Sequence, residues 1–297
     1  LFSSPLPRAF SSRTTGAHAL SHDTGDKRPF LQKHHLLLRR LHSLTGIAPI
    51  GVFLLSHLTT NSSILWGRLL ASHADIAGPE AAGVATFQHE VNFIHSLPFL
   101  ILIEIFGLWF PIAFHSILGV YYATTGKPNV GAYPYRDNWR YTLQRLSGYL
   151  GVLFIFYHVA TLRWGWTFLI PGGTKWSGEY AASTLALALR GHAEQITLAG
   201  FAVSTFYMLG VSLLVFHLAN GLWTAAITWG LTVSRNAMKR WGYICAGLGA
   251  ALMIMAWAAV IGFVTLDPAK ARAVEEAMLR GEHNTPVLTD ARPPAQH

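Results

Sequence analysis

The chain has 297 residues, of which 52% are hydrophobic and 12% are charged, about half the charged share of a soluble domain. This composition excludes an ordinary water-soluble domain, and a single cysteine excludes an internal disulfide or a cysteine-bound metal cluster. The formal charge of +8 comes without interleaved basic and aromatic motifs, so no nucleic-acid partner is expected.

The first region, residues 1–38, is polar and basic. It contains no acidic residue before Asp23 and is rich in Ser and Arg, which resembles an organelle transit peptide in composition. We favour a disordered cytoplasmic extension instead. No secretory signal peptide is expected, because the first long apolar run begins near Leu41.

Five apolar segments follow, at 40–60, 97–124, 139–166, 196–232 and 240–266. Each reaches the ~20 residues that a helix needs to cross a bilayer. Residues 39–266 are therefore predicted to form an all-α membrane domain of five transmembrane helices, with Pro49 and Pro111 tolerated inside two of them. Residues 267–297 form a polar outer tail, in which 269–280 are predicted to make a short amphipathic helix.

Charged residues between the segments predict the orientation of the helices. One side of the membrane receives almost only basic residues, whereas the other receives a mixture of both signs. The positive-inside rule places the N-terminus in the cytoplasm and the C-terminus outside. The basic side carries Lys33, Arg39, Arg40, Lys127, Arg136, Arg140, Arg145, Arg235, Lys239 and Arg240.

Beyond its first turn, each of the first four apolar segments contains one of the 15 histidines. An imidazole in hydrocarbon is costly without a partner, so these residues are candidate functional groups. A hydrogen bond between helices explains one such histidine as well as a ligand role does, but four favour the ligand role. His57 and His158 lie toward the outer ends of their helices, and we call them the outer pair; His115 and His217 lie toward the inner ends and form the inner pair.

Two levels of two imidazoles fit two iron porphyrins better than one zinc or copper ion, whose ligands share a single depth. Two axial imidazoles fill both open positions of the iron, so such a site transfers electrons and does not activate oxygen. Two stacked haems would form an electron path across the bilayer.

Similarities between the segments support the same grouping. The second and fourth share Phe-His-x-x-x-Gly, in which Gly119 and Gly221 lie one turn after the histidine, where a macrocycle could approach the backbone; close helix packing is the alternative role. The first and third share a start, Arg40-Leu41 with Thr45-Gly46 and Arg145-Leu146 with Ser147-Gly148.

Longer runs occur in this order along the chain: 39–46 (RRLHSLTG), 96–99 (SLPF), 104–106 (EIF), 114–115 (FH), 144–148 (QRLSG), 217–223 (HLANGLW) and 228–230 (TWG). Together they resemble the cytochrome b membrane anchor of succinate:quinone oxidoreductases (succinate dehydrogenase or fumarate reductase), in the form with one anchor chain and two haems. The resemblance covers residues 36–265. Val215 departs from it, because some fumarate reductases of this kind carry an acid at that position.

The resemblance implies an anchor for a flavoprotein and an iron–sulfur subunit on the cytoplasmic face of a prokaryotic plasma membrane, with FAD and iron–sulfur clusters only in those partners. Electrons from succinate would reach menaquinone or another quinone near the outer face, and fumarate reduction is the reverse. His115 and His217 would hold the inner haem b, and His57 and His158 the outer one. The isolated chain would not oxidise succinate, and the whole complex could form an oligomer.

Other polar residues are candidates for the haem propionates or the quinone. Arginine binds carboxylates through two nitrogens, although topology and lipid headgroups also explain basic residues at helix ends. For the propionates the candidates are Arg40, His42, Ser43, Gln144 and Arg145. Quinone reduction needs a nearby proton donor, for which Glu90 and Glu104 are the candidates; Glu104 could instead hold helices together, and His42 could bond at a helix start.

Two alternatives remain open. A dihaem b subunit of another quinone-linked complex, such as a nitrate reductase or formate dehydrogenase, would co-purify with a molybdenum subunit. A helical transporter would use the intramembrane histidines for metal ions or protons. Transporters often have inverted repeats, whereas the similarities here relate segments of parallel topology.

Overall fold

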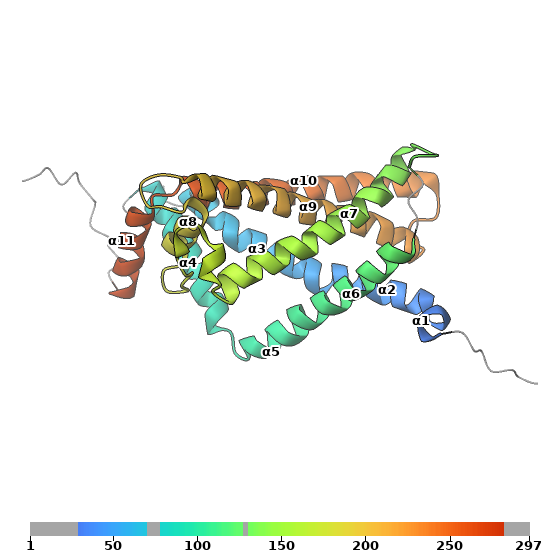
Figure 1. Cartoon of the computed structure of the whole chain (residues 1–297), viewed down its shortest axis with the longest axis horizontal. Coiled ribbons are helices and arrows are strands. Elements are labelled where there is room, and N and C mark those ends of the chain that lie inside the picture. Colours follow the sequence, from blue (N-terminus) through green and yellow to red (C-terminus); the bar gives the residue numbers. More distant parts are fainter. Residues whose placement is uncertain (1–28, 70–77, 127–129, 282–297) are drawn as a thin grey trace, which may run out of the picture. The chain divides into compact units, whose positions relative to one another are not determined.

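A computed structural model describes residues 29–69, 78–126 and 130–281 (Figure 1). The predicted extension up to residue 28, Lys127 and the end of the tail from residue 282 lie outside the described residues. The short helix α1 (Phe30–Lys33) belongs to a first compact unit, Leu1–His35. The second compact unit is Leu36–His297.

Within the described ranges every regular element is a helix, and five stretches are long and apolar enough to span a membrane. The predicted all-α membrane fold with five spans is therefore confirmed. The spans are His35–Leu69, Leu100–Thr125, Asp137–Arg163, Leu198–Thr228 and Arg235–Thr265.

The first two spans are interrupted where the sequence places proline. A single residue, Ala48, separates helix α2 (His35–Ile47) from α3 (Pro49–Trp66). Proline suits a first helical position because it lacks an N–H group. The second span consists of α5 (Leu100–Glu104), the π-helix η2 (Ile105–Trp109) and α6 (Phe110–Thr125), with Pro111 in the first turn of α6.

The third span also contains a π-helix, whereas the fourth and fifth spans are each a single α-helix. Helix α7 (Arg136–His158) runs directly into the π-helix η3 (Val159–Arg163). Helix α9 (Leu198–Thr228) packs along both α7 and α10 (Arg235–Thr265), and α10 also packs along α3 (Figure 1). These contacts bring the histidine-bearing helices α3, α7 and α9 into one bundle.

Three further helices pack together at one end of the bundle, and we call them the cap (Figure 1). They are α4 (Pro79–Ser96), α8 (Ala181–Arg190) and α11 (Pro268–Leu279). The helix predicted within the tail is confirmed, displaced by one residue, whereas α4 and α8 lie in segments that the sequence left as long loops. Buried residues of the cap share a core with Ile64 of α3 and Phe263 of α10.

A buried carboxylate joins two helices of the cap. Glu275 of α11 has no exposed surface and accepts hydrogen bonds from the backbone N–H groups of Ala182 (2.7 Å) and Ser183 (3.1 Å) and from the Ser183 hydroxyl. Gln88 of α4 accepts another from the N–H of Ala181 at 3.1 Å. The first turn of any helix has N–H groups without intrahelical acceptors, and α4 and α11 supply the acceptors for α8.

Candidate functional site

Four histidine rings from four spans meet in two pairs. In the outer pair, the ring centres of His57 (α3) and His158 (α7) lie 5.8 Å apart at an interplanar angle of 85°. In the inner pair, His115 (α6) and His217 (α9) lie 6.1 Å apart at 82°. These are the pairs that the positions of the residues along their helices predict.

The spacing of each pair suits two axial ligands of one metal. An imidazole nitrogen lies about 2 Å from the metal that it binds, so two axial rings have centres roughly 6 Å apart across an iron. In the part of the chain that the structure describes, no group of three or more His, Cys, Asp or Glu side chains gathers as a metal cluster. Each pair offers two imidazole donors, which is the number that a bis-histidine haem iron takes from its protein.

Both rings of the inner pair are held through Nδ1. His115 Nδ1 lies 2.8 Å from the carbonyl oxygen of His42, and His217 Nδ1 lies 3.1 Å from that of Gln144. A carbonyl oxygen can only accept, so this geometry assigns the proton to Nδ1 in both rings. Nε2 then keeps the lone pair that a metal requires.

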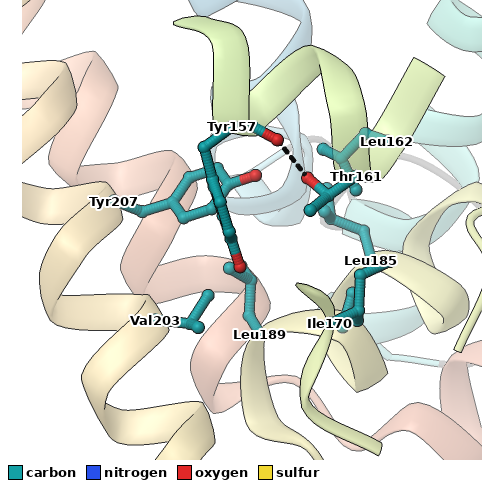
Figure 2. Close-up of a pocket in the computed structure, with 9 residues that line it drawn as sticks. Tyr157, Thr161, Leu162, Ile170, Leu185, Leu189, Val203 and Tyr207 are labelled. Carbon is teal, nitrogen blue, oxygen red and sulfur yellow. Dashed lines mark hydrogen bonds between the residues drawn. The ribbon is translucent and has the colours of Figure 1, made fainter. Parts of the chain in front are cut away.

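The outer pair has a different surrounding. His158 Nδ1 lies 3.4 Å from the hydroxyl of Tyr207, which can donate or accept and so does not determine the tautomer. Tyr207, Tyr157 and Thr161 line a cavity beside α8 (Figure 2). Within it, the Thr161 hydroxyl donates a hydrogen bond to the Tyr157 carbonyl at 2.8 Å. The cavity holds at most about 210 Å³, less than the roughly 300–1,000 Å³ of small-molecule sites.

Two of the predicted propionate residues on α7 already have protein partners. The Gln144 side chain donates to the carbonyl of His217 (3.1 Å) and accepts from Asn220 (2.8 Å). The Arg145 guanidinium donates to the carbonyl of Gly126 at 2.7 Å and to the Tyr141 hydroxyl at 3.3 Å. Gln144 thus contacts a ligand residue directly, whereas Arg145 links α7 to the end of α6.

The three predicted residues on α2 behave differently from one another. The Ser43 hydroxyl donates to the Arg40 carbonyl (2.9 Å) and accepts from the Trp229 indole (2.8 Å), and the Arg40 guanidinium lies 5.9 Å from that indole ring. His42 lies inside α2, not at a helix start, and its ring stacks on His115 at 4.0 Å. Its Nδ1 is buried and makes no hydrogen bond within the described part of the chain, as expected for a group beside a bound polar ligand.

The two acidic candidates also differ. Glu104 forms an ion pair with Arg163 at 2.8 Å, which joins the second and third spans. This contact corresponds to the helix-joining role considered for Glu104 in the sequence. Glu90 lies partly exposed on α4 and forms no ion pair with another described residue.

The glycines that follow His115 and His217 by one turn lie close to other side chains of the protein. A Cβ atom at Gly119 would meet the His42 ring at 3.2 Å, and one at Gly221 would meet the Gln144 amide at 3.5 Å. These glycines therefore face His42 and Gln144, which are neighbours of His115 and His217. Buried Asn220 was missed as a site residue, although a polar residue three positions after His217 on the same face of an apolar helix is a usable signal.

Comparison with known proteins finds one that is similar over most of the chain. The succinate dehydrogenase cytochrome b558 subunit of Bacillus subtilis (strain 168) is 32% identical over 226 residues, which make up 76% of this chain and 96% of that protein. No family profile and no solved structure matches the chain. The similarity is thus not confined to a single motif.

Proposed function

This chain belongs to the family of succinate dehydrogenase cytochrome b subunits, the membrane anchors of complex II, and from that premise we propose that it carries electrons between a partner iron–sulfur subunit and a quinone. It holds two b haems, one between His115 and His217 and one between His57 and His158. The observation that carries this proposal is the meeting of four rings from four spans in two pairs, at 5.8 and 6.1 Å. Haem b supplies, when bound, an iron that exchanges single electrons.

The protein's own residues determine what this iron can do. An imidazole from each residue of a pair would hold the haem iron, and two protein ligands would favour electron transfer over binding of oxygen. The carbonyls of His42 and Gln144 hold the inner rings by Nδ1 and make them more basic donors. All four rings lie on apolar spans, and each is only partly exposed.

The partners follow from the same membership. A flavoprotein with FAD and an iron–sulfur subunit dock on the basic face, which we propose is the cytoplasmic face of a prokaryotic plasma membrane. Menaquinone or another quinone reacts near the outer pair. Glu90 is the better of the two candidate proton donors there, because the Glu104 carboxylate is held by Arg163.

Removing one ligand from each pair tests the haem assignment. In the purified complex, His115→Ala and His57→Ala should each reduce the haem content from two to one, because one protein ligand cannot replace the pair. The measurement is a dithionite-minus-oxidised spectrum with the haem-to-protein ratio. His89→Ala, which changes an exposed histidine on α4, is the matched control and should keep both haems.

Two results would contradict the proposal: a wild-type complex without haem, or two haems retained in both ligand variants. The partner assignment has a separate test, because a flavoprotein should co-purify with the chain. A molybdenum subunit in its place would indicate a different quinone-linked complex.

A further inference from the structure

The ring of His115 lies directly against the backbone of α2. A Cβ atom at Gly46 would lie 2.5 Å from His115 Cε1 and 2.9 Å from its Nδ1. The carbonyl that accepts from this Nδ1 belongs to His42, four residues earlier and one turn away on the same face. The Thr45 hydroxyl donates to the same carbonyl at 3.0 Å. Only glycine at position 46 lets the ring approach that carbonyl.

The ring of His217 lies against α7 in the same way. A Cβ atom at Gly148 would lie 3.1 Å from His217 Cε1. The accepting carbonyl belongs to Gln144, again four residues before the glycine, at 3.1 Å. The Ser147 hydroxyl donates to that carbonyl at 3.1 Å and lies 3.2 Å from the Nδ1 atom.

The two arrangements share three parts in the same order. Each has a carbonyl acceptor, then a hydroxyl residue three positions later that bonds to the same carbonyl, then a glycine that gives room to the ring. They coincide with the start shared by the first and third segments, Thr45-Gly46 and Ser147-Gly148. Among the described residues no such arrangement is found at His158, whose Nδ1 lies 3.4 Å from the Tyr207 hydroxyl.

We infer that residues 42–46 and 144–148 are a duplicated positioning element that holds both inner-pair histidines as Nδ1–H tautomers, with Nε2 left for the iron. The inference rests on the proposed function, because it concerns ligands of a haem. Gly46 and Gly148 are positioning residues, since they act through the histidines and touch no reacting group themselves. The first and third spans carry no histidine of the inner pair. The positioning element explains why these two spans nevertheless have similar sequences at their starts.

A chemical consequence follows for the inner haem. A carbonyl that accepts from Nδ1 raises the basicity of the imidazole and its ability to stabilise oxidised iron. Losing this contact should raise the midpoint potential of the inner haem. Loss of such an outer contact also weakens metal binding by roughly 10–100-fold, so partial loss of the inner haem is expected as well.

The test is Gly46→Ala in the purified complex, with Gly148→Ala as a milder second variant. Gly46→Ala should remove much of the inner haem, or raise its potential and change its low-spin EPR signal, while the outer haem keeps its signal and potential. Gly148→Ala should retain two haems with a smaller rise of the inner potential, because its contact is 3.1 Å and not 2.5 Å. Gly247→Ala on α10, where a Cβ would meet nothing within 4 Å, is the control.

The outcomes separate the two proposals. If the wild-type complex holds no haem, the proposed function fails. If it holds two and the glycine variants leave the inner signal and potential unchanged, or alter both haems equally, the positioning element is wrong and the function stands. Should Gly46→Ala fail to assemble, the potential of the inner haem in Gly148→Ala decides.

Discussion

Hydrogen bonds link the inner-pair histidine His217 to the end of the third span. Arg140 donates to the Asn220 side chain at 2.8 Å, Asn220 donates to Gln144 at 2.8 Å, and Gln144 donates to the His217 carbonyl at 3.1 Å. The Arg140 guanidinium also lies 3.6 Å from the centre of the Trp223 ring. Polar groups in an apolar bundle are costly unless they form hydrogen bonds. This series of hydrogen bonds therefore makes the orientation of α9 against α7 specific.

The buried carboxyl of Glu275 should make the stability of the cap depend on pH. Burial raises the pKa of this group above its usual value, although hydrogen bonds from Ser183 and Ala182 act in the opposite direction. The folded state then binds the proton more tightly than the unfolded state. The stability that the group contributes is therefore complete below about pH 4.3 and is lost as the pH rises through the raised pKa.

Glu275→Gln should accordingly flatten the dependence of thermal stability on pH, because the amide stays neutral. The measurement is helical circular dichroism of the purified complex during heating, at a series of pH values from acid to neutral. Glu276→Gln is the control, since the Glu276 side chain is 45% exposed beside Arg272. Equal pH profiles for the wild type and Glu275→Gln would show that this carboxyl does not act as described.

Two contacts link the second and third spans beside their π-helices. Glu104, the residue before η2, forms an ion pair at 2.8 Å with Arg163, the last residue of η3. Trp109, the last residue of η2, stacks on Trp164, the residue after η3, with ring centres 6.4 Å apart. A π-helix is rare and is often found at functional sites. Here η3 begins directly after His158, so the change of helical pitch starts at a residue of the outer pair.

The backbones of helices α3 and α4 are in close contact at Gly83. A Cβ atom there would lie 2.3 Å from the carbonyl oxygen of Ile64, and a backbone atom cannot move aside without separating the helices. Gly83→Ala should therefore destabilise the cap by about 1–3 kcal/mol, the usual cost of overpacking. The midpoint of thermal unfolding of the purified complex measures the effect.

Gly247→Ala is again the comparison, because its added methyl group meets open space and alanine is the better helix former by roughly 0.5–1 kcal/mol. Its midpoint should stay the same or rise. A Gly83→Ala complex as stable as this control would mean that α3 and α4 can separate without loss.

For the molecule as a whole, five spans place the two ends of the bundle on opposite faces of the membrane, and loop charge predicts which face is which. In a Cys245→Ala background, Gly131→Cys should react with a membrane-impermeant maleimide only after cell lysis. Lys175→Cys should react in intact cells, because the mixed-charge loops are predicted to lie outside. Both positions are exposed, and Cys245 is buried. The reverse labelling pattern would invert the assigned orientation and the docking face with it.

Local signals were sufficient for the spans and for the four histidines. An apolar run of membrane length and an imidazole within it can each be recognised in one stretch of sequence. A constant rise per residue then converts sequence position into depth, which is why the pairing of His57 with His158 and of His115 with His217 could be predicted before any contact was known.

The helices α4 and α8 and the role of Gly46 depend on contacts between segments that lie far apart in the sequence. Helices α4 and α8 are too short or too weakly apolar to be recognised as spans, and α8 takes the acceptors for its first turn from Gln88 and Glu275, about 90 positions away in either direction. The role of Gly46 was equally hidden, because a glycine matters only once the ring of His115 lies against it. The pattern of apolar and polar residues in one helix indicates which side chains are buried. Which residue of another helix contacts each buried side chain depends on how the helices pack.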